Sequence, residues 1–478
     1  MNSEIKKLAS ETIFYGFATI LPRTLNFLLV PLHTRVFAQE AYGDVSELYG
    51  YVAFFNIVFL FGMETAFFRF TNKEGLDPAK VFRMTQTVVS AISVFLSGIF
   101  LIFYRSIAQV FSISESRIIV WICLTMLVDA MVAIPFARLR QQNKVLRFTS
   151  FKLINITLLI GFNVYFLWLS GNPNPGIELV FLANFLANAA YVIFFFKDLI
   201  SWKPLFDRKL SPEILSYSYP VVLTGLAGMT NEMFSRISID NWLPKDFYPG
   251  KSADYVQGVF AACYRFSVFM SLVVMAFRFA AEPFFFSKSS DKNSPELFAK
   301  INHYFILIAS AIMVGICLNL DWLKYFIDAG YWEGLNIVPV LLLGYIFLGV
   351  YYNISIWFKV TDRTHFGTII TFVGAGVTVG LNYILIPAYG IMGSSLVTLI
   401  CYFSMTALCY GIGQRYYPVP YTLGKDLGII TMACLIVFVN DKIVINNVAL
   451  SIGIRGVASL LVMWVVYSLT FRKDMLYP

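Results

Sequence analysis

About fourteen long apolar stretches fill this 478-residue chain from end to end, and most exceed the ~20 residues that a helix needs to cross a bilayer. In lipid, every backbone N–H and C=O group must find its partner within the protein, and a helix provides those partners within one segment. The chain is 58% hydrophobic and only 13% charged, which is more apolar surface than a soluble protein of this length can bury. We therefore predict an all-α polytopic membrane protein with spans near residues 11–37, 44–70, 82–104, 117–137, 149–169, 177–196, 213–239, 255–282, 299–320, 335–358, 366–386, 391–412, 427–440 and 448–471.

The thirteenth stretch, 427–440, is the weakest of these predicted spans because it is short. Only Tyr421 to Asp426, at the expected interface, can extend it. If this stretch enters the bilayer without crossing it, the C-terminus lies on the other side.

The loops between the stretches carry their charge unequally. About two thirds of the 36 Lys and Arg residues fall on alternate loops, which the positive-inside rule assigns to the cytoplasm. Both termini are therefore expected in the cytoplasm. The same bias accounts for the net charge of +8, so the basic balance does not indicate a nucleic-acid partner.

The polar linker Lys197 to Pro212 divides the chain near its middle. Six spans precede it and six follow, which predicts two pseudo-symmetric six-helix lobes in the same orientation around a central cavity. The predicted divisions are 1–204 and 205–413, with a terminal helix pair at 414–478.

The first span carries a polar stripe that includes Arg23 and Asn26. A charge at membrane depth costs roughly 2.5–3.5 kcal/mol, so it tends to face protein or water. Pro22 and Pro31 interrupt the hydrogen bonding of this helix and allow it to bend. The pattern favours a cationic face that lines a cavity on a helix with a hinge. The alternative is an arginine that pairs with a neighbouring carboxylate for packing.

The eighth span carries Arg265 and Arg278, which point about 140° apart on a straight helix. Arg278 is followed four residues later by Glu282, and the two are expected to form an ion pair. Arg265 has no acid on its own helical face and is the stronger candidate for a cavity residue.

Four carboxylates are candidates for coupling ions or for counter-ions of the span arginines: Glu64, Asp129, Glu232 and Asp240. Glu232, Arg236 and Asp240 follow one another at steps of four, which predicts a self-satisfying ladder with a structural role. Glu64 and Asp129 have no such local partner in the sequence, and the residues alone leave both roles open.

The chain shows no pattern for chemistry on a substrate. Its six cysteines lie within apolar stretches without metal-ligand spacing, and its three histidines are isolated. There is no nucleophile–base set, metal cluster or phosphate loop. We therefore predict no enzyme activity, no metal and no cofactor.

Several motifs together resemble one family. They are PLHTRVF at 31–37 followed by Tyr42-Gly43, FGMETAFFRF at 61–70, RLRQQN at 138–143, AFRFAAEPF at 276–284 and NYILIPAYGIMG at 382–393. In order and spacing they resemble the polysaccharide transporters, the Wzx-type O-antigen and exopolysaccharide flippases of the multidrug/oligosaccharidyl-lipid/polysaccharide superfamily. The resemblance covers nearly the whole chain.

The resemblance implies two six-helix lobes around a cationic cavity lined by helices 1, 2, 7 and 8, with spans 13 and 14 as additions. Arg23 and Arg265 match positions where lumen arginines are expected, and Asn26 and Arg278 join them as predicted cavity residues. It further implies a multi-pass flippase of the bacterial cytoplasmic membrane that moves lipid-linked anionic oligosaccharide for O-antigen, capsule or exopolysaccharide synthesis.

The expected partners are this undecaprenyl-diphosphate-linked substrate, membrane lipid, a coupling proton or Na⁺, and glycan polymerase proteins. Two other transporters remain as alternatives. A cation-coupled multidrug exporter expects an acidic cavity, for which Asp129 and Glu64 are the candidates. A lipid II flippase also fits the additional terminal helix pair.

Overall fold

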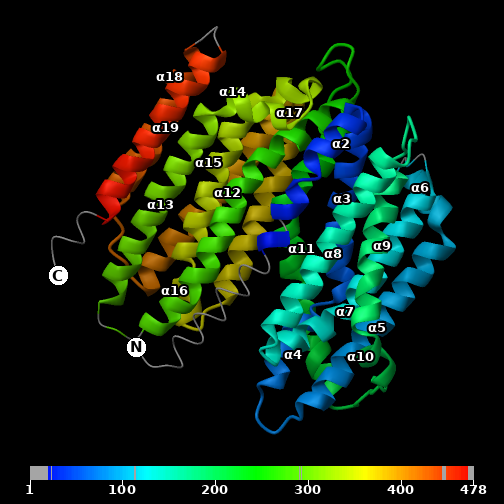
Figure 1. Ribbon diagram of the computed structural model, residues 1–478. Helices are drawn as coiled ribbons and strands as arrows, with labels where there is room; N and C mark the ends of the chain where they lie inside the picture. The colour runs from blue at the N-terminus through cyan, green and yellow to red at the C-terminus, as the bar shows by residue number, and fades with distance from the viewer. Residues whose placement is uncertain are drawn as a thin grey trace. The chain divides into compact units, whose positions relative to one another are not determined.

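The computed structural model describes residues 20–22, 24–111, 113, 115–289, 291, 293–443 and 448–471. All regular structure in these residues is helical, and they contain no β-strand (Figure 1). The prediction of an all-α protein is therefore confirmed. The chain divides into two compact units.

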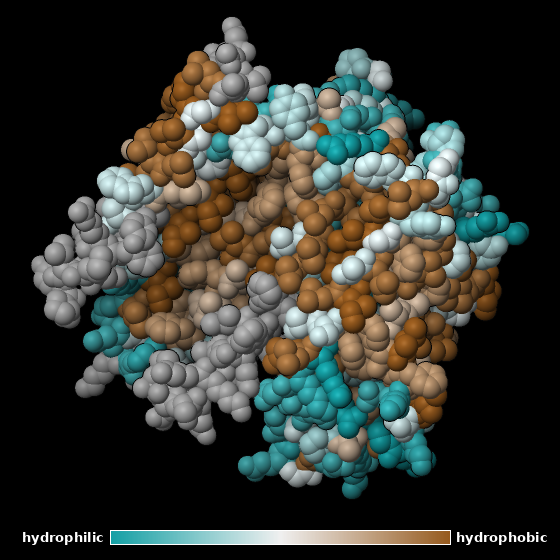
Figure 2. Space-filling model, in the orientation of Figure 1, coloured by the Kyte–Doolittle hydropathy of each residue, from teal (hydrophilic) through white to brown (hydrophobic). Residues whose placement is uncertain are grey.

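The N-terminal unit comprises the described residues up to Val36 and Asp44–Met229. Two of its helices, α3 and α11, continue into the other unit. In Figure 2, hydrophobic residues cover most of the visible face of this unit, while hydrophilic residues gather at the end where α4 and α10 lie. Its helices are α2 (Val30–Val36), α3 (Gln39–Leu60), α4 (Met63–Thr71), α5 (Pro78–Ile102), α6 (Tyr104–Val110), α7 (Arg117–Gln141), α8 (Val145–Val164) with a π-helical turn η1 (Tyr165–Leu169), α9 (Glu178–Phe194), α10 (Phe196–Ser201) and α11 (Leu210–Trp242).

Helix α7 forms the centre of the N-terminal unit, packing against α4, α5, α8 and α9. Phe136 of α7 is buried and makes edge contacts with the rings of Phe148, Tyr191 and Phe195. Such aromatic pairs each contribute ~0.5–1.5 kcal/mol beyond the area they bury. This cluster fixes α7 against α8 and α9, which carry the polar partners described below.

The C-terminal unit comprises Phe37–Gly43 and the described chain from Thr230 onward. Helix α15 lies at its centre and packs against α12, α13 and α17, while α18 and α19 both pack against α13. Its elements are α12 (Ala253–Lys288), α13 (Ser294–Leu318), α14 (Leu320–Leu323), the 3₁₀ turns η2 (Lys324–Phe326) and η3 (Ala329–Ile337), α15 (Val338–Ile354), α16 (Ile356–Val360), α17 (His365–Tyr416), α18 (Leu423–Lys442) and α19 (Val448–Phe471).

The start of α3 belongs to the C-terminal unit because two glycines let its backbone approach α12. A Cβ atom added to Gly258 would lie 1.8 Å from the carbonyl oxygen of Gln39, and one added to Gly43 would lie 2.3 Å from that of Asp254. Small residues allow this approach of helix backbones in membranes. The Tyr331 hydroxyl donates to the Phe37 carbonyl at 2.9 Å and closes the same contact.

Nine of the described helices are long and apolar enough to cross a membrane, and two shorter apolar helices cover 178–194 and 450–465. The multi-pass membrane character is therefore confirmed. Helix α17 joins the predicted eleventh and twelfth spans, and Gly390 kinks it with φ 57° and ψ −135°. A residue other than glycine adopts that conformation only under strain.

The thirteenth predicted span is helix α18, which begins at Leu423 and reaches Lys442. Of the proposed extension Tyr421–Asp426, the last four residues form the first turn of α18. Helix α18 is among the nine candidate spans. The lobe divisions predicted at 204/205 and 413/414 remain predictions.

Candidate functional site

The first predicted cavity residue, Arg23, lies outside the described residues, as do all positions before Ile20. Its neighbours Pro22 and Asn26 are described, and Asn26 is exposed. The α-helical hydrogen bonding changes just after Asn26, where the Leu29 N–H donates to the Asn26 carbonyl three residues back at 3.1 Å. Helix α2 then begins at Val30, next to Pro31. The hinge at Pro22 and Pro31 stays a prediction, with this local change in bonding at its centre.

Arg265 lies in the first half of α12 with its side chain half-buried. Among the described residues it makes no ion pair, hydrogen bond or stacking contact. A cation at membrane depth faces either water or protein, because the hydrocarbon solvates it poorly. Arg265 is therefore a guanidinium that the described fold does not neutralise.

Arg278 lies in a small charged network near the other end of α12. Its Nε atom is 3.7 Å from Glu282, as the spacing predicted, and its guanidinium stacks 4.7 Å from the ring centre of Tyr352. Lys359 of α16 also contacts Glu282, at 2.6 Å. One carboxylate thus serves two cations and leaves the network with net positive charge.

Arg236 is held by aromatic residues of other helices rather than by the acids next to it in the sequence. It forms no ion pair with Glu232 or Asp240 within the described chain, so the expected ladder does not hold it. Instead, the buried Arg236 guanidinium lies 4.0 Å from the ring centre of Tyr264, whose hydroxyl is hydrogen-bonded to that of Tyr345. No spacing in the sequence indicates this contact, because the two tyrosines come from α12 and α15.

The two acids that flank Arg236 lie in different surroundings. Glu232 is exposed and contributes only a longer-range attraction to Arg236. The Asp240 carboxyl lies close enough to Asp254, at the start of α12, for the two acids to repel each other.

In the N-terminal unit, Glu64 pairs with Arg140 of α7. The Arg140 guanidinium also lies 4.9 Å from the ring centre of Phe68, one turn along α4 from Glu64. This pair ties α4 to α7. The contact assigns Glu64 a counter-ion that the sequence did not predict.

Asp129 is also partnered, although it is isolated in its own helix. The Asn188 side-chain amide of α9 donates to Asp129 at 2.9 Å. The Asn155 side-chain amide of α8 donates to Oδ1 of Asn188 at 2.8 Å. Lys152 of α8 adds a coulombic attraction to Asp129. The N-terminal unit thus contains a polar chain across three helices, with an acid at one end.

No group of His, Cys, Asp and Glu suited to a metal ion occurs in the part of the chain that the structure describes. The described residues instead offer two arginines without an ion pair, Arg236 and Arg265, in the C-terminal unit. In the N-terminal unit they offer an acid, Asp129, in an amide network. Both are features by which a membrane protein holds charged groups in a low-dielectric setting.

Solved structures with similar folds include three membrane transporters. The lipid II flippase MurJ in an inward closed conformation superposes with a TM-score of 0.72 at 17% identity, over 97% of this chain and 99% of that one. A multidrug resistance MATE family transporter of the MOP superfamily, in an inward-facing conformation, gives 0.62 at 12% identity over 88% and 96%. The Vibrio cholerae MATE transporter VcmN, in the bent form, gives 0.55 at 12% identity over 91% and 100%.

At these identities the likeness to the solved structures concerns the fold alone. A comparison with the curated proteins finds no match. The family model described as "Polysaccharide biosynthesis protein" matches residues 8–289, more than half of the chain. The chain therefore belongs to the polysaccharide biosynthesis protein family.

Proposed function

We propose that this protein is a flippase that moves undecaprenyl-diphosphate-linked oligosaccharide repeat units across the bacterial cytoplasmic membrane for surface polysaccharide synthesis. O-antigen, capsule and exopolysaccharide are the product classes. Both termini lie in the cytoplasm in this proposal, in keeping with the unequal loop charges. Glycan polymerase proteins are the expected partners on the outer side.

The observation that carries the proposal is the guanidinium of Arg265, which has no counter-ion among the described residues. Leaving a cation unpaired at membrane depth costs roughly 2.5–3.5 kcal/mol, which an anionic ligand offsets when it binds. A diphosphate offers oxygen acceptors in the geometry that a guanidinium bonds twice. Arg23 and Asn26 on the first span, and Arg278 on α12, complete the proposed set of cavity residues.

Transport proceeds by alternating access, in which the polar headgroup crosses through the cavity while the prenyl tail stays in lipid. Pro22 and Pro31 provide the hinge of the first span. Export of one negative charge from an inside-negative cell gains roughly 2.3 kcal/mol per 100 mV. A coupling proton or Na⁺ is a further source of energy, with Glu64, Asp129, Glu232 and Asp240 as candidate groups.

Complementation of a deletion strain tests the proposal. Loss of the gene should abolish surface glycan and accumulate lipid-linked repeat units on the cytoplasmic face. Arg265→Ala should lower export by about 10- to 100-fold, since hydrogen bonds to charged groups contribute ~1.5–3 kcal/mol, and Arg265→Lys should be milder. Arg363→Ala is the matched control, because Arg363 stacks on Tyr416 at 4.1 Å, outside the spans. Normal glycan in the deletion strain, or full export by Arg265→Ala, would contradict the proposal.

Two other functions have a specific observation in their favour. The fold likeness to a lipid II flippase extends over 97% of this chain, and rescue of peptidoglycan synthesis in a strain depleted of its own lipid II flippase would support that function. The Asp129 network offers an acid to a cation-coupled exporter. Altered drug resistance with normal surface glycan would favour the exporter.

A further inference from the structure

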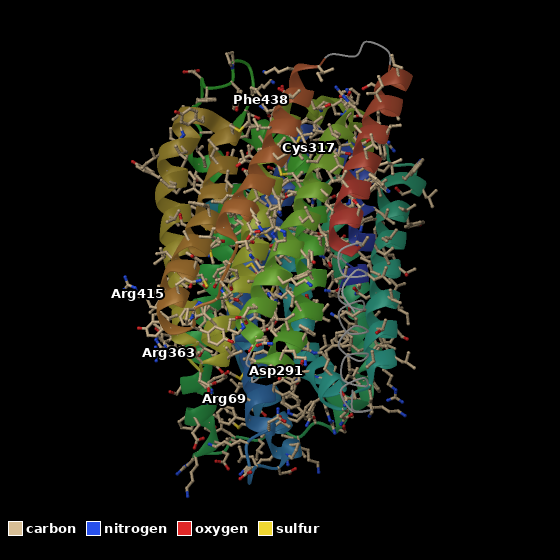
Figure 3. The ribbon with its side chains drawn as sticks, turned by 90° about the vertical axis from the view of Figure 1, so that its left-hand side faces the viewer. Arg69, Asp291, Cys317, Arg363, Arg415 and Phe438 are labelled. Atoms are coloured by element: carbon tan, nitrogen blue, oxygen red, sulfur yellow. The ribbon has the colours of Figure 1, made fainter. Side chains whose placement is uncertain are left out.

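Two adjoining pockets open at the end of the C-terminal unit where α13 and α18 finish. The larger, of about 630 Å³, lies between α13, α15 and α18, and the smaller, of about 370 Å³, lies beside α14 and α19. Figure 3 shows Cys317 and Phe438 at this end, opposite to Asp291, Arg363 and Arg415. Residues that line both pockets are Cys317, Leu320, Asp321, Lys324, Asn440 and Asp441.

The acid Asp321 is held in place by α19. Its Oδ2 atom pairs with Arg455 and accepts a hydrogen bond from the Ser451 hydroxyl at 3.0 Å. Arg455 is buried and also donates to the Ile443 carbonyl at 2.9 Å. The Asp321 side chain nevertheless remains 46% exposed, and Oδ1 has no partner among the described residues. That oxygen is left to accept a hydrogen bond from a ligand.

A cation and a second acid stand at the rim. The Lys324 ammonium lies 4.6 Å from the ring centre of Trp332, whose indole N–H donates to the Lys324 carbonyl at 2.9 Å. Asp441 is 77% exposed and lies 3.7 Å from Lys442, its chain neighbour. Trp322 and Tyr325 are exposed nearby, and such aromatic residues concentrate at the membrane interface.

The floor of the larger pocket is apolar. Pro339, Val340 and Leu343 of α15 line it, together with Val437 and Phe438 of α18. A headgroup at the polar rim would therefore have space below it for an acyl chain. This arrangement of charged rim and apolar floor is that of an amphipathic ligand rather than of a soluble one.

We propose that these pockets bind a membrane phospholipid with a phosphoethanolamine headgroup. Its phosphate meets Lys324, its primary ammonium meets Asp321 and Asp441, and one acyl chain lies along α15 and α18. In the orientation proposed above, the site faces the outer leaflet. The lining of the two pockets includes none of the proposed cavity residues, so this proposal does not depend on Arg265.

The net charge of the pocket lining favours this zwitterionic lipid over an anionic one. The lining holds two acids, Asp321 and Asp441, against two bases, Lys324 and Arg455, so it is neutral as a whole. A diphosphate carrier lipid would bring two acids next to its own negative charges. A quaternary choline headgroup matches the charge but has no N–H to donate to the free oxygen of Asp321.

Native mass spectrometry of the purified full chain in detergent tests the proposal. The protein is titrated with dioleoyl-phosphatidylethanolamine, -phosphatidylcholine and -phosphatidylglycerol, and separately with undecaprenyl phosphate. We expect the ethanolamine lipid to bind about tenfold more tightly than the other three, which corresponds to the ~1.4 kcal/mol of one hydrogen bond to a charged group. Equal binding of the three phospholipids, or tighter binding of phosphatidylglycerol or undecaprenyl phosphate, overturns the proposal.

Variants locate the site. Asp441→Asn and Lys324→Gln should each weaken binding of the ethanolamine lipid about three- to tenfold. Both should fold, because neither removes the Asp321–Arg455 pair. Asp291→Asn is the matched control, since Asp291 is an exposed acid that pairs with Lys288 at 3.0 Å at the opposite end of the unit. If both rim variants bind the lipid like the wild type, the site is not where we propose.

Discussion

The contact between the start of α3 and α12 makes Gly258→Ala a severe test of the fold. The added Cβ would lie 1.8 Å from the Gln39 carbonyl oxygen and 3.1 Å from the Gly43 nitrogen. Both neighbours are backbone atoms, so no side-chain rotation relieves the clash. The two backbones must separate by more than about 1 Å, and overpacking of this kind costs ~1–3 kcal/mol. We expect the free energy of unfolding to fall by an amount at the upper end of that range, because two packed helices can separate only by moving along their whole contact.

Thermal unfolding in detergent measures the loss, with a thiol-reactive dye as reporter. Cys263 is fully buried little more than one helical turn after Gly258, so its thiol reacts only when the contact opens. Gly376→Ala is the control, since a Cβ there meets nothing within 4 Å and alanine favours a helix over glycine by ~1 kcal/mol. Equal melting temperatures for the two variants would refute the close approach of α3 and α12.

Four further variants test three contacts. Glu64→Gln and Arg140→Gln should show a coupling of ~1 kcal/mol or less in a double-mutant cycle, because both side chains are about a third exposed; a coupling of zero would mean that the pair contributes nothing. The Lys80 ammonium and two backbone N–H groups hold the pKa of Asp207 well below its usual range. The ionised Asp207 therefore contributes its full stabilisation of the fold above pH ~4, and this contribution is lost as the pH falls. Asp207→Asn should therefore flatten the dependence of melting temperature on pH below ~4, and an unchanged profile would contradict the assignment. Arg236→Gln should lower the free energy of unfolding by ~2 kcal/mol through loss of the stacked cation, and wild-type stability would show that the stacking contributes nothing.

Hydropathy located the helices well because the spans are long and the loops short. Their ends were less predictable. Helix α12 continues through Pro283 to Lys288, whereas the predicted span ended at residue 282, just before this proline. A proline inside a membrane helix is tolerated when neighbouring groups satisfy the backbone oxygen it leaves unbonded. Where such compensation is provided by other helices, the local sequence does not report it.

The partners of the charged residues were the part that the sequence could not supply. Glu64 and Asp129 each looked isolated because their contacts come from other helices, Arg140 on α7 and Asn188 on α9. An amphipathic stripe usually tells which face of a helix meets its neighbours. Spans that are apolar on all sides carry no such stripe. For a single acid within such a span, the sequence therefore does not predict which neighbouring helix the acid faces.

Arg236 and Arg265 differ in burial and in contacts, which predicts a structural role for Arg236 and a transport role for Arg265. The Arg236 guanidinium is buried against the ring of Tyr264, and its removal should harm the fold. Arg265 is half-buried and has no partner among the described residues, so it carries the ~2.5–3.5 kcal/mol cost of a membrane charge without a compensating contact. Arg265→Leu should consequently be as stable as the wild type or more so, while export falls. If Arg265→Leu instead unfolds like an Arg236 variant, then Arg265 serves packing, and the argument that it receives the substrate anion fails.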